Sequence, residues 1–161
     1  MKILAVIPAR AGSKGIPNKN IRLLNEKPLI YYSIKNAIDC PYIDDIIVST
    51  DSQEVELIAK QMGVRVKWRD ESLCTDSITL DSVIYDVVKD ECVDIVITMQ
   101  PTSPNLSVHT LNNAINHLKV NELDTIVSAV NAPHLSWRVD EHGIKLPDYK
   151  ERLNRQYLPP H

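Results

Sequence analysis

The sequence has few features of a secreted, membrane or metal-binding protein. Its three cysteines, Cys40, Cys74 and Cys92, are widely spaced and form no C-x-x-C pair. This usage is typical of a reducing cytoplasm and argues against a disulfide framework or a zinc site. No segment approaches the 18 apolar residues of a membrane span, and the apolar run at the N-terminus is too short for a signal peptide. We therefore expect a cytoplasmic protein with no membrane partner.

The sequence also has no excess of positive charge. Its 18 basic and 21 acidic residues give a formal net charge of −3, which argues against a dedicated nucleic-acid binder. Within residues 10–22, however, four cations occur without a carboxylate: Arg10, Lys14, Lys19 and Arg22. A basic segment in a mildly acidic protein indicates one small anionic ligand rather than a long polyanion.

The histidines show neither metal-ligand spacing nor partners for a catalytic triad. We expect each to be a surface or helix residue. They are His109, His117, His134, His142 and His161.

Apolar runs alternate with helical spacing along most of the chain. Short β-branched runs predict buried strands at residues 2–8, 45–49, 64–68, 94–99 and 125–130. Apolar residues at helical spacing predict helices around residues 30–38, 55–62, 83–88 and 111–118. Asp51 is the expected N-cap of the second helix, with Glu54 reaching back. Beyond residue 132 the pattern weakens, with room only for short strands near Trp137 and Ile144.

This alternation predicts a doubly wound α/β fold, in which helices sandwich a mostly parallel sheet. At 161 residues, the chain is most economically one domain. Ligands of such sheets bind outside the carboxyl ends of the strands, at the topological switch point. Three loops should lie there, at residues 9–20, 69–79 and 100–104.

The first of these loops has the composition of a phosphate-binding loop. Gly12 and Gly15 frame Ser13 and Lys14, and glycine permits the positive φ values that turn successive backbone N–H groups toward an anion. Arg10 and Lys14 could neutralise a triphosphate. The loop matches neither the ATPase P-loop nor the dinucleotide fingerprint. The alternative is a tight, solvated turn with incidental cations.

The other two loops carry weaker signals. In QPTSP, at residues 100–104, the Gln100 amide could bind a sugar or a base. The alternative is a proline-stiffened turn before a helix capped by Ser103 or Ser107. Hydroxyl groups at residues 74–79 could likewise bind a base or a phosphate, or they could simply precede a helix capped by Thr79 or Ser77.

Four segments in the same order resemble the acylneuraminate cytidylyltransferase family, the CMP-sialic acid synthetases and their relatives for other nonulosonic acids. The segments are IPARAGSKGIPNKNI at 7–21, IIVSTD at 46–51, QPTSP at 100–104 and RQYLPP at 155–160. The resemblance implies a Rossmann-like nucleotidyltransferase fold. It also implies a reaction in which CTP and a nine-carbon keto sugar acid give a CMP-sugar and pyrophosphate, with Mg²⁺ as cofactor.

The resemblance also implies roles for individual residues. The triphosphate would be held by Arg10, Ser13 and Lys14, and Lys19 would act near the leaving phosphates, so that Arg10, Lys14 and Lys19 form the catalytic set. The remaining nucleotide-binding residues would be Asn20, Arg69 and Thr79. The sugar-binding residues would be Gln100, Arg155 and Gln156.

The chain departs from the family pattern in its acidic residues. Family members continue past RQ-x-L-P into a dimerisation region and a metal-binding D-x-D motif, and this sequence contains no D-x-D. The resemblance therefore implies a C-terminally truncated chain without a metal site of its own, in which Mg²⁺ binds mainly through CTP phosphates and water. We expect such a chain to bind CTP weakly and to turn over little. A longer parent would be a homodimer, whereas this chain could be a monomer.

Three alternatives remain open. The acceptor could be legionaminate, pseudaminate or deoxy-octulosonate, although deoxy-octulosonate enzymes usually carry an acidic residue in place of the QPTSP context. The chain could instead bind CTP without catalysis. An NAD-type oxidoreductase rests on fold analogy alone and lacks the glycine fingerprint.

Overall fold

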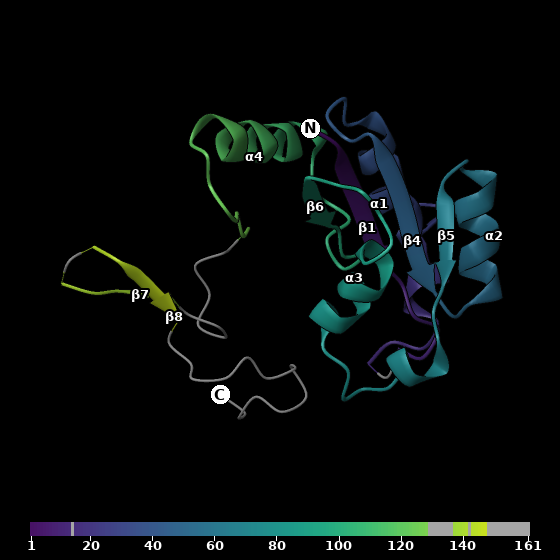
Figure 1. Cartoon of the computed structure of the whole chain (residues 1–161). Coiled ribbons are helices and arrows are strands. Elements are labelled where there is room, and N and C mark those ends of the chain that lie inside the picture. The colour runs from purple at the N-terminus through teal and green to yellow at the C-terminus, as the bar shows by residue number, and fades with distance from the viewer. Residues whose placement is uncertain (14, 129–136, 142, 148–161) are drawn as a thin grey trace. The chain divides into compact units, whose positions relative to one another are not determined.

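The computed structural model describes residues 1–13, 15–128, 137–141 and 143–147 (Figure 1). The chain forms two compact units, Met1–Leu123 and Asp124–His161. The first contains a sheet with its covering helices. The described part of the second contains a β-hairpin. A single domain spanning all 161 residues stays a prediction.

The first unit is built on a four-stranded parallel sheet with the order β5-β4-β1-β6. Its strands are β1 (Ile3–Pro8), β4 (Asp45–Thr50), β5 (Arg65–Trp68) and β6 (Ile95–Thr98). In register, Ala5 of β1 lies between Ile46 of β4 and Ile97 of β6. The first four predicted strands are therefore confirmed, each to within one residue at either end.

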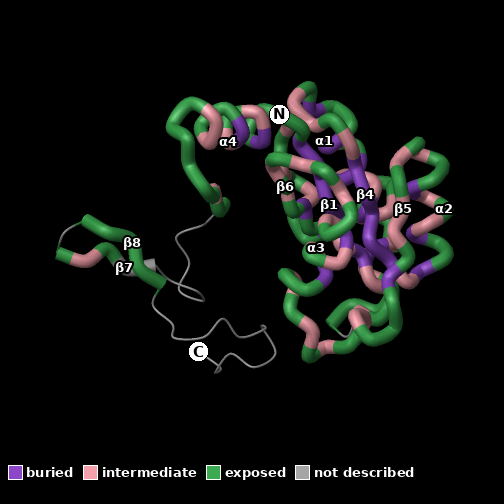
Figure 2. Tube along the Cα trace, in the orientation of Figure 1, coloured by how far each residue is buried: buried purple, intermediate pink, exposed green. Residues whose placement is uncertain are grey.

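Burial is concentrated on the two central strands, β1 and β4 (Figure 2). Residues 3–7 of β1 are almost completely buried, which explains their continuous apolar run. The outer strands β5 and β6 contain half-buried and exposed residues, because among the described strands each pairs along one edge only. The core thus lies under the middle of the sheet.

The side chains of β1 alternate between two hydrophobic clusters. Ile3, Ala5 and Ile7 belong to the larger cluster, to which three helices contribute. These helices are α1 (Leu29–Asp39), α2 (Gln53–Gln61) and α4 (Val108–Val120). Leu4 and Val6 belong to the smaller cluster, to which α3 (Leu80–Val88) contributes. Helices therefore cover both faces of the sheet, which confirms the predicted doubly wound fold.

The topological switch point lies beside β1. The chain first adds β4 and β5 on one side of β1, and then returns through α3 to place β6 on the other side. The carboxyl ends of the four strands meet at one edge of the sheet because the strands are parallel. Ligands of such folds bind at this edge.

The helix caps confirm two predictions and correct a third. Thr79 caps α3 and Ser107 caps α4, each accepting a hydrogen bond from a backbone N–H of the first turn. For α2, Asp51 is the wrong residue. The cap is Ser52, whose Oγ accepts from the Val55 N–H at 3.3 Å and bonds the Glu54 carboxylate at 2.7 Å. Asp51 is instead engaged by the first loop, as described below.

The predicted fifth strand, residues 125–130, is wrong for its described part. Residues 125–128 form no strand, and three of the four are exposed. A β-branched run provides propensity, but a strand also needs a partner with which to pair.

Two hairpins complete the described structure. The pattern did not predict β2 (Leu23–Leu24) and β3 (Lys27–Pro28). They are joined by Asn25 and Glu26, which both have positive φ, as a type I′ turn requires. In the second unit, β7 (Trp137–Val139) pairs with β8 (Lys145–Pro147), which confirms short strands in this region. Among the described helices, none is long and apolar enough to cross a membrane.

Candidate nucleotide-binding site

The loop that follows β1 is tied to the end of β4 by three hydrogen bonds. The Ala9 N–H donates to the Ser49 carbonyl at 2.9 Å, and the Thr50 hydroxyl donates to the Ala9 carbonyl at 2.6 Å. The Ala11 N–H then donates to the Asp51 carboxylate at 2.7 Å. The path of the loop is therefore set by three successive residues of a neighbouring strand end, 40 positions away in sequence.

Asn20 holds the far end of this loop. Its side-chain amide donates to the Arg10 carbonyl at 3.0 Å, and the residue is only 6% exposed. Asn18, at φ 54°, provides the left-handed turn that leads into the short 3-10 helix Lys19–Ile21. Asn20 thus shapes the loop. Its predicted contact with cytidine stays a prediction.

The two loop glycines do not play the conformational role expected of them. Among the described glycines, positive φ occurs at Gly63 and Gly143, and not at Gly12 or Gly15. A Cβ atom at Gly12 or Gly15 would meet nothing within 4 Å. The left-handed conformation is supplied by Asn18 instead, and the glycines leave open space next to the loop.

The Arg10 side chain reaches the loop that follows β5. Its Nη2 donates to the Asp76 carboxylate at 2.7 Å, and its Nη1 donates to the Cys74 carbonyl at 3.2 Å. The predicted strand-end loops at residues 9–20 and 69–79 are therefore joined through this guanidinium.

Lys19 is joined to the start of the loop through its neighbour Asn20, which bonds the Arg10 carbonyl. Burial lowers the pKa of the Lys19 ammonium below its usual value, and the positive charge of Arg10 lowers this pKa further. Two of the cations predicted for phosphate binding therefore share one region, where an anion would relieve their mutual repulsion.

The lowered pKa of Lys19 predicts a pH dependence of CTP binding. Phosphates attract the ammonium form, and its population falls as the pH rises through the lowered pKa. CTP affinity should therefore decline at a pH below the ordinary lysine pKa of about 10.4. Calorimetric CTP titrations from neutral pH to about pH 10 would measure this decline. Lys19→Arg should move it to higher pH because a guanidinium stays charged, whereas Lys60→Arg on α2 should leave it unchanged.

Arg69 is a buried cation at the end of β5. It is 4% exposed, and its guanidinium donates to the Ser49 carbonyl at 2.9 Å and to the Ser49 hydroxyl at 3.2 Å. Burial lowers the pKa of this guanidinium. These bonds brace the strand end on which the first loop rests, and contact with cytidine stays a prediction for Arg69.

The remaining predicted residues are spread more widely. Ser13 is half-buried, and its N–H donates to the Ala11 carbonyl at 2.9 Å. Thr79 is exposed and used as the cap of α3, and Gln100 is exposed just beyond β6. Their ligand contacts stay predictions, as do those of the residues outside the described ranges: Lys14, Arg155 and Gln156.

Sequence reasoning missed the residues that hold the loops together. The sequence predicts Asp51 only as a helix cap and Thr50 only as part of a family segment, and Asp76 lies among residues singled out for their hydroxyl groups. The sequence did contain a signal for them. Asp51 and Asp76 each follow a strand, at the sheet edge where the basic loop at residues 9–20 was also expected.

Comparison with known proteins identifies the family of this chain. A family model described as cytidylyltransferase matches residues 4–155. The chain belongs to the cytidylyltransferase family. It is 38% identical over 151 residues to the CMP-N,N'-diacetyllegionaminic acid synthase of Legionella pneumophila, an alignment with 89% of this chain and 65% of that protein.

Two further cytidylyltransferases show a similar level of identity. The N-acylneuraminate cytidylyltransferase of Oncorhynchus mykiss is 34% identical, over 88% of this chain and 33% of its own length. The pseudaminic acid cytidylyltransferase of Campylobacter jejuni is 33% identical, over 98% of this chain and 67% of its own length. The chain thus spans between one third and two thirds of these relatives.

Solved structures support the cytidylyltransferase fold. A CMP:2-keto-3-deoxy-manno-octonic acid synthetase complexed with CTP has a TM-score of 0.67 at 22% identity, covering 76% of this chain and 49% of that chain. A 4-diphosphocytidyl-2C-methyl-D-erythritol synthase has a TM-score of 0.64 at 15% identity, covering 98% and 70%. At these identities the likeness concerns the fold alone.

The described side chains do not by themselves form a magnesium site. Within the described ranges, no three His, Cys, Asp or Glu residues gather as metal ligands. Asp51 is bonded to the Ala11 N–H, and Asp76 is paired with Arg10. A divalent ion prefers several oxygen ligands that are free to face it, so these residues do not fit a protein-held Mg²⁺.

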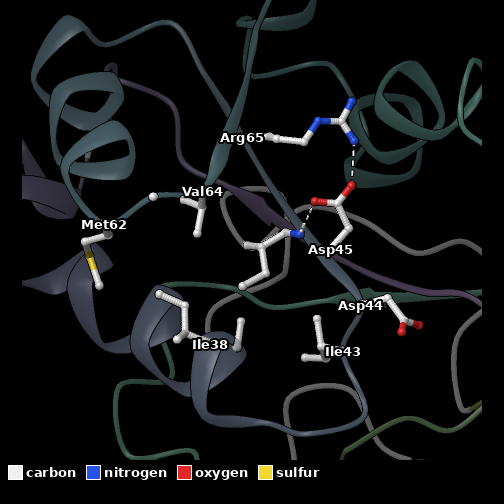
Figure 3. A pocket seen from close by; sticks show the side chains of 10 residues that line it. Ile38, Ile43, Asp44, Asp45, Met62, Val64 and Arg65 are labelled. Atoms are coloured by element: carbon white, nitrogen blue, oxygen red, sulfur yellow. Dashed lines mark hydrogen bonds and ion pairs between the residues drawn. The ribbon is translucent and has the colours of Figure 1, made fainter.

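The structure also contains a pocket of about 330 Å³ at the opposite, amino end of β4 and β5 (Figure 3). Ile38, Ile43 and Met62 contribute apolar side chains to it. On its rim, Asp45 is paired with Arg65 at 2.6 Å. Because this pocket lies at the other end of the strands, it is separate from the candidate nucleotide-binding site.

Proposed function

We propose that the chain transfers CMP from CTP to the anomeric hydroxyl of a nonulosonic acid, giving a CMP-sugar and pyrophosphate. One observation carries this proposal. In a chain of the cytidylyltransferase family, Arg10 and Lys19 belong to one loop that Asn20 closes on the Arg10 carbonyl and that is anchored to β4, at the carboxyl edge of the sheet. This is the edge at which such folds bind nucleotides.

The reaction is an in-line displacement at phosphorus. The sugar hydroxyl oxygen bonds to the α-phosphorus, the bond from that phosphorus to the bridging oxygen of pyrophosphate breaks, and the hydroxyl proton is released. Such transfers depend on positioning and on stabilising the charge of the phosphate oxygens. Arg10 and Lys19 supply the compensating positive charge from the described loop. Lys14 and Ser13 are proposed to bind the phosphates with them. Mg²⁺ would arrive with the CTP phosphates and water.

The acceptor is proposed from the named relatives. They are named for N,N'-diacetyllegionaminic acid, N-acylneuraminate and pseudaminic acid, which are all nonulosonic acids. Gln100, Arg155 and Gln156 are the proposed sugar contacts. A cytoplasmic location and, for a longer form of the protein, a homodimer belong to the same proposal.

Calorimetry with four nucleoside triphosphates tests the nucleotide assignment. CTP should bind about tenfold more tightly than UTP, ATP or GTP, because a base pocket that hydrogen-bonds cytosine leaves polar groups unpaired with other bases. Equal affinity for all four would contradict the assignment. A panel of N-acylneuraminate, legionaminate, pseudaminate and deoxy-octulosonate with CTP, assayed for CMP-sugar, tests the acceptor. CTP binding without product from any acid would instead favour the binding-only alternative.

A further inference from the structure

The acidic partner of Arg10 is the feature that the proposed reaction leaves unexplained. Asp76 accepts from Arg10 Nη2 at 2.7 Å, and the two side chains are 21% and 29% exposed. Two residues earlier in the same loop, the Cys74 carbonyl accepts from Nη1 at 3.2 Å. One loop thus grips both terminal nitrogens of a guanidinium that comes from 64 to 66 residues away in sequence.

The loop that carries these two acceptors is itself well braced. Asp70 caps the 3-10 helix Glu71–Leu73 by accepting from the Ser72 N–H at 2.9 Å. The Cys74 N–H donates to the Glu71 carbonyl at 3.0 Å, and the Cys74 thiol donates to the Asp70 carbonyl at 3.2 Å. The positions of the Cys74 carbonyl and Asp76 are therefore fixed by local structure rather than by Arg10 alone.

We propose that Asp76 is a positioning residue that, together with the Cys74 carbonyl, holds the Arg10 guanidinium ready for the phosphates of the nucleotide. This inference rests on the proposed function. A guanidinium has five N–H groups, and the two bonds use one on each terminal nitrogen, so further donors remain for phosphate oxygens. A pre-oriented arginine loses less conformational freedom when it binds an anion than a freely rotating one.

Asp76 has a second, opposing effect on a triphosphate. Its negative charge lies beside the cation and repels phosphate, so that its removal could strengthen binding. Two substitutions separate these effects. Asp76→Asn removes the charge but keeps an oxygen that accepts from Arg10, whereas Asp76→Ala removes both the charge and the acceptor.

The proposal predicts different CTP affinities for the two variants. Asp76→Ala should weaken CTP binding about tenfold, because a charge-assisted hydrogen bond to Arg10 is lost. Asp76→Asn should bind CTP as well as the unmodified chain, or more tightly. Glu71→Gln is the matched control, since it removes a carboxylate charge from the same loop at an exposed residue. It should leave CTP binding unchanged.

A double-mutant cycle tests whether Asp76 acts through Arg10. Against an Arg10→Ala background, Asp76→Ala should no longer weaken CTP binding, because the residue that it positions is gone and only the removal of a repelling carboxylate remains. Thermal melting by circular dichroism checks that each variant is folded. Asp76→Leu, which also removes both the charge and the acceptor, replaces the alanine variant if that one unfolds.

Inorganic tripolyphosphate provides a second probe that does not depend on the base. Because Arg10 would act on the phosphates, the same cycle should be seen with this anion. If tripolyphosphate shows the cycle but CTP is not preferred over other nucleotides, the positioning role stands and the nucleotide assignment fails. If Asp76→Ala binds both probes as well as the unmodified chain does, or if it still weakens binding in the absence of Arg10, the positioning role is wrong.

Discussion

Replacing Arg10 with alanine is expected to weaken CTP binding about 100-fold, because a charged donor to phosphate is lost at a partly buried position. The substitution also removes the guanidinium charge of Arg10 that offsets the negative charge of the Asp76 carboxylate beside the proposed phosphate site. That carboxylate then repels the ligand, so both consequences act in the same direction. The CTP dissociation constant measured by calorimetry at fixed ionic strength checks the prediction.

Arg65→Ala provides a matched control for this loss. Arg65 is also an arginine in an ion-pair network, bonded to Asp45 at 2.6 Å and to Glu91 at 2.5 Å. It begins β5, however, and so lies at the end of the sheet opposite the first loop. Its replacement should leave CTP affinity unchanged. A loss of affinity similar to that of Arg10→Ala would mean that general charge, rather than the local site, attracts the nucleotide.

Replacing Thr50 with valine is expected to lower the free energy of unfolding by about 3 kcal/mol, since two buried backbone groups lose their partner. Thr50 is 0% exposed; its hydroxyl donates to the Ala9 carbonyl at 2.6 Å and accepts from the Ser52 N–H at 3.0 Å. Valine has nearly the same shape but neither capability. Urea denaturation would measure the change, and CTP affinity should fall as well because Ala9 begins the loop proposed to bind the nucleotide.

The matched control for this variant is Thr98→Val. Thr98 ends the outer strand β6 and is exposed, so its free energy of unfolding should change by less than about 0.5 kcal/mol. If Thr50→Val were equally mild, the hydroxyl of Thr50 would not be what holds the loop to β4.

The fold was largely predictable because its signals are local. The β-branched runs around Val6 and Ile47 and the helical spacing of Ile30 and Ile34 each reflect burial of one segment, and burial leaves a periodic pattern. Residues 125–128 show the limit of such signals, since their run resembles the others yet forms no strand. The hairpin at Leu23–Pro28 was missed because Asn25 and Glu26 are an uncommon pair for a type I′ turn.

The candidate site was predictable only in its cations. Arg10 and Lys19 stand out because no acidic residue accompanies them in sequence. Asp51 and Asp76 are distant in sequence, and only the parallel pairing of the strands and the course of the loops bring them to the first loop. The expectation for Gly12 was wrong for a different reason. Glycine was expected to supply the left-handed conformation of the loop, but the residue with positive φ is Asn18.

The long sequence separations within the candidate site determine when this site forms during folding. Arg10 must meet residues 64 to 66 positions later, and Ala11 must meet one 40 positions later. Contacts of this kind form late and slowly, because closing such long loops costs chain entropy before any contact compensates for it. A nascent or partly folded chain therefore has no place for the triphosphate. Nucleotide added during refolding should leave the folding rate nearly unchanged and slow unfolding instead, because it can grip only the finished sheet.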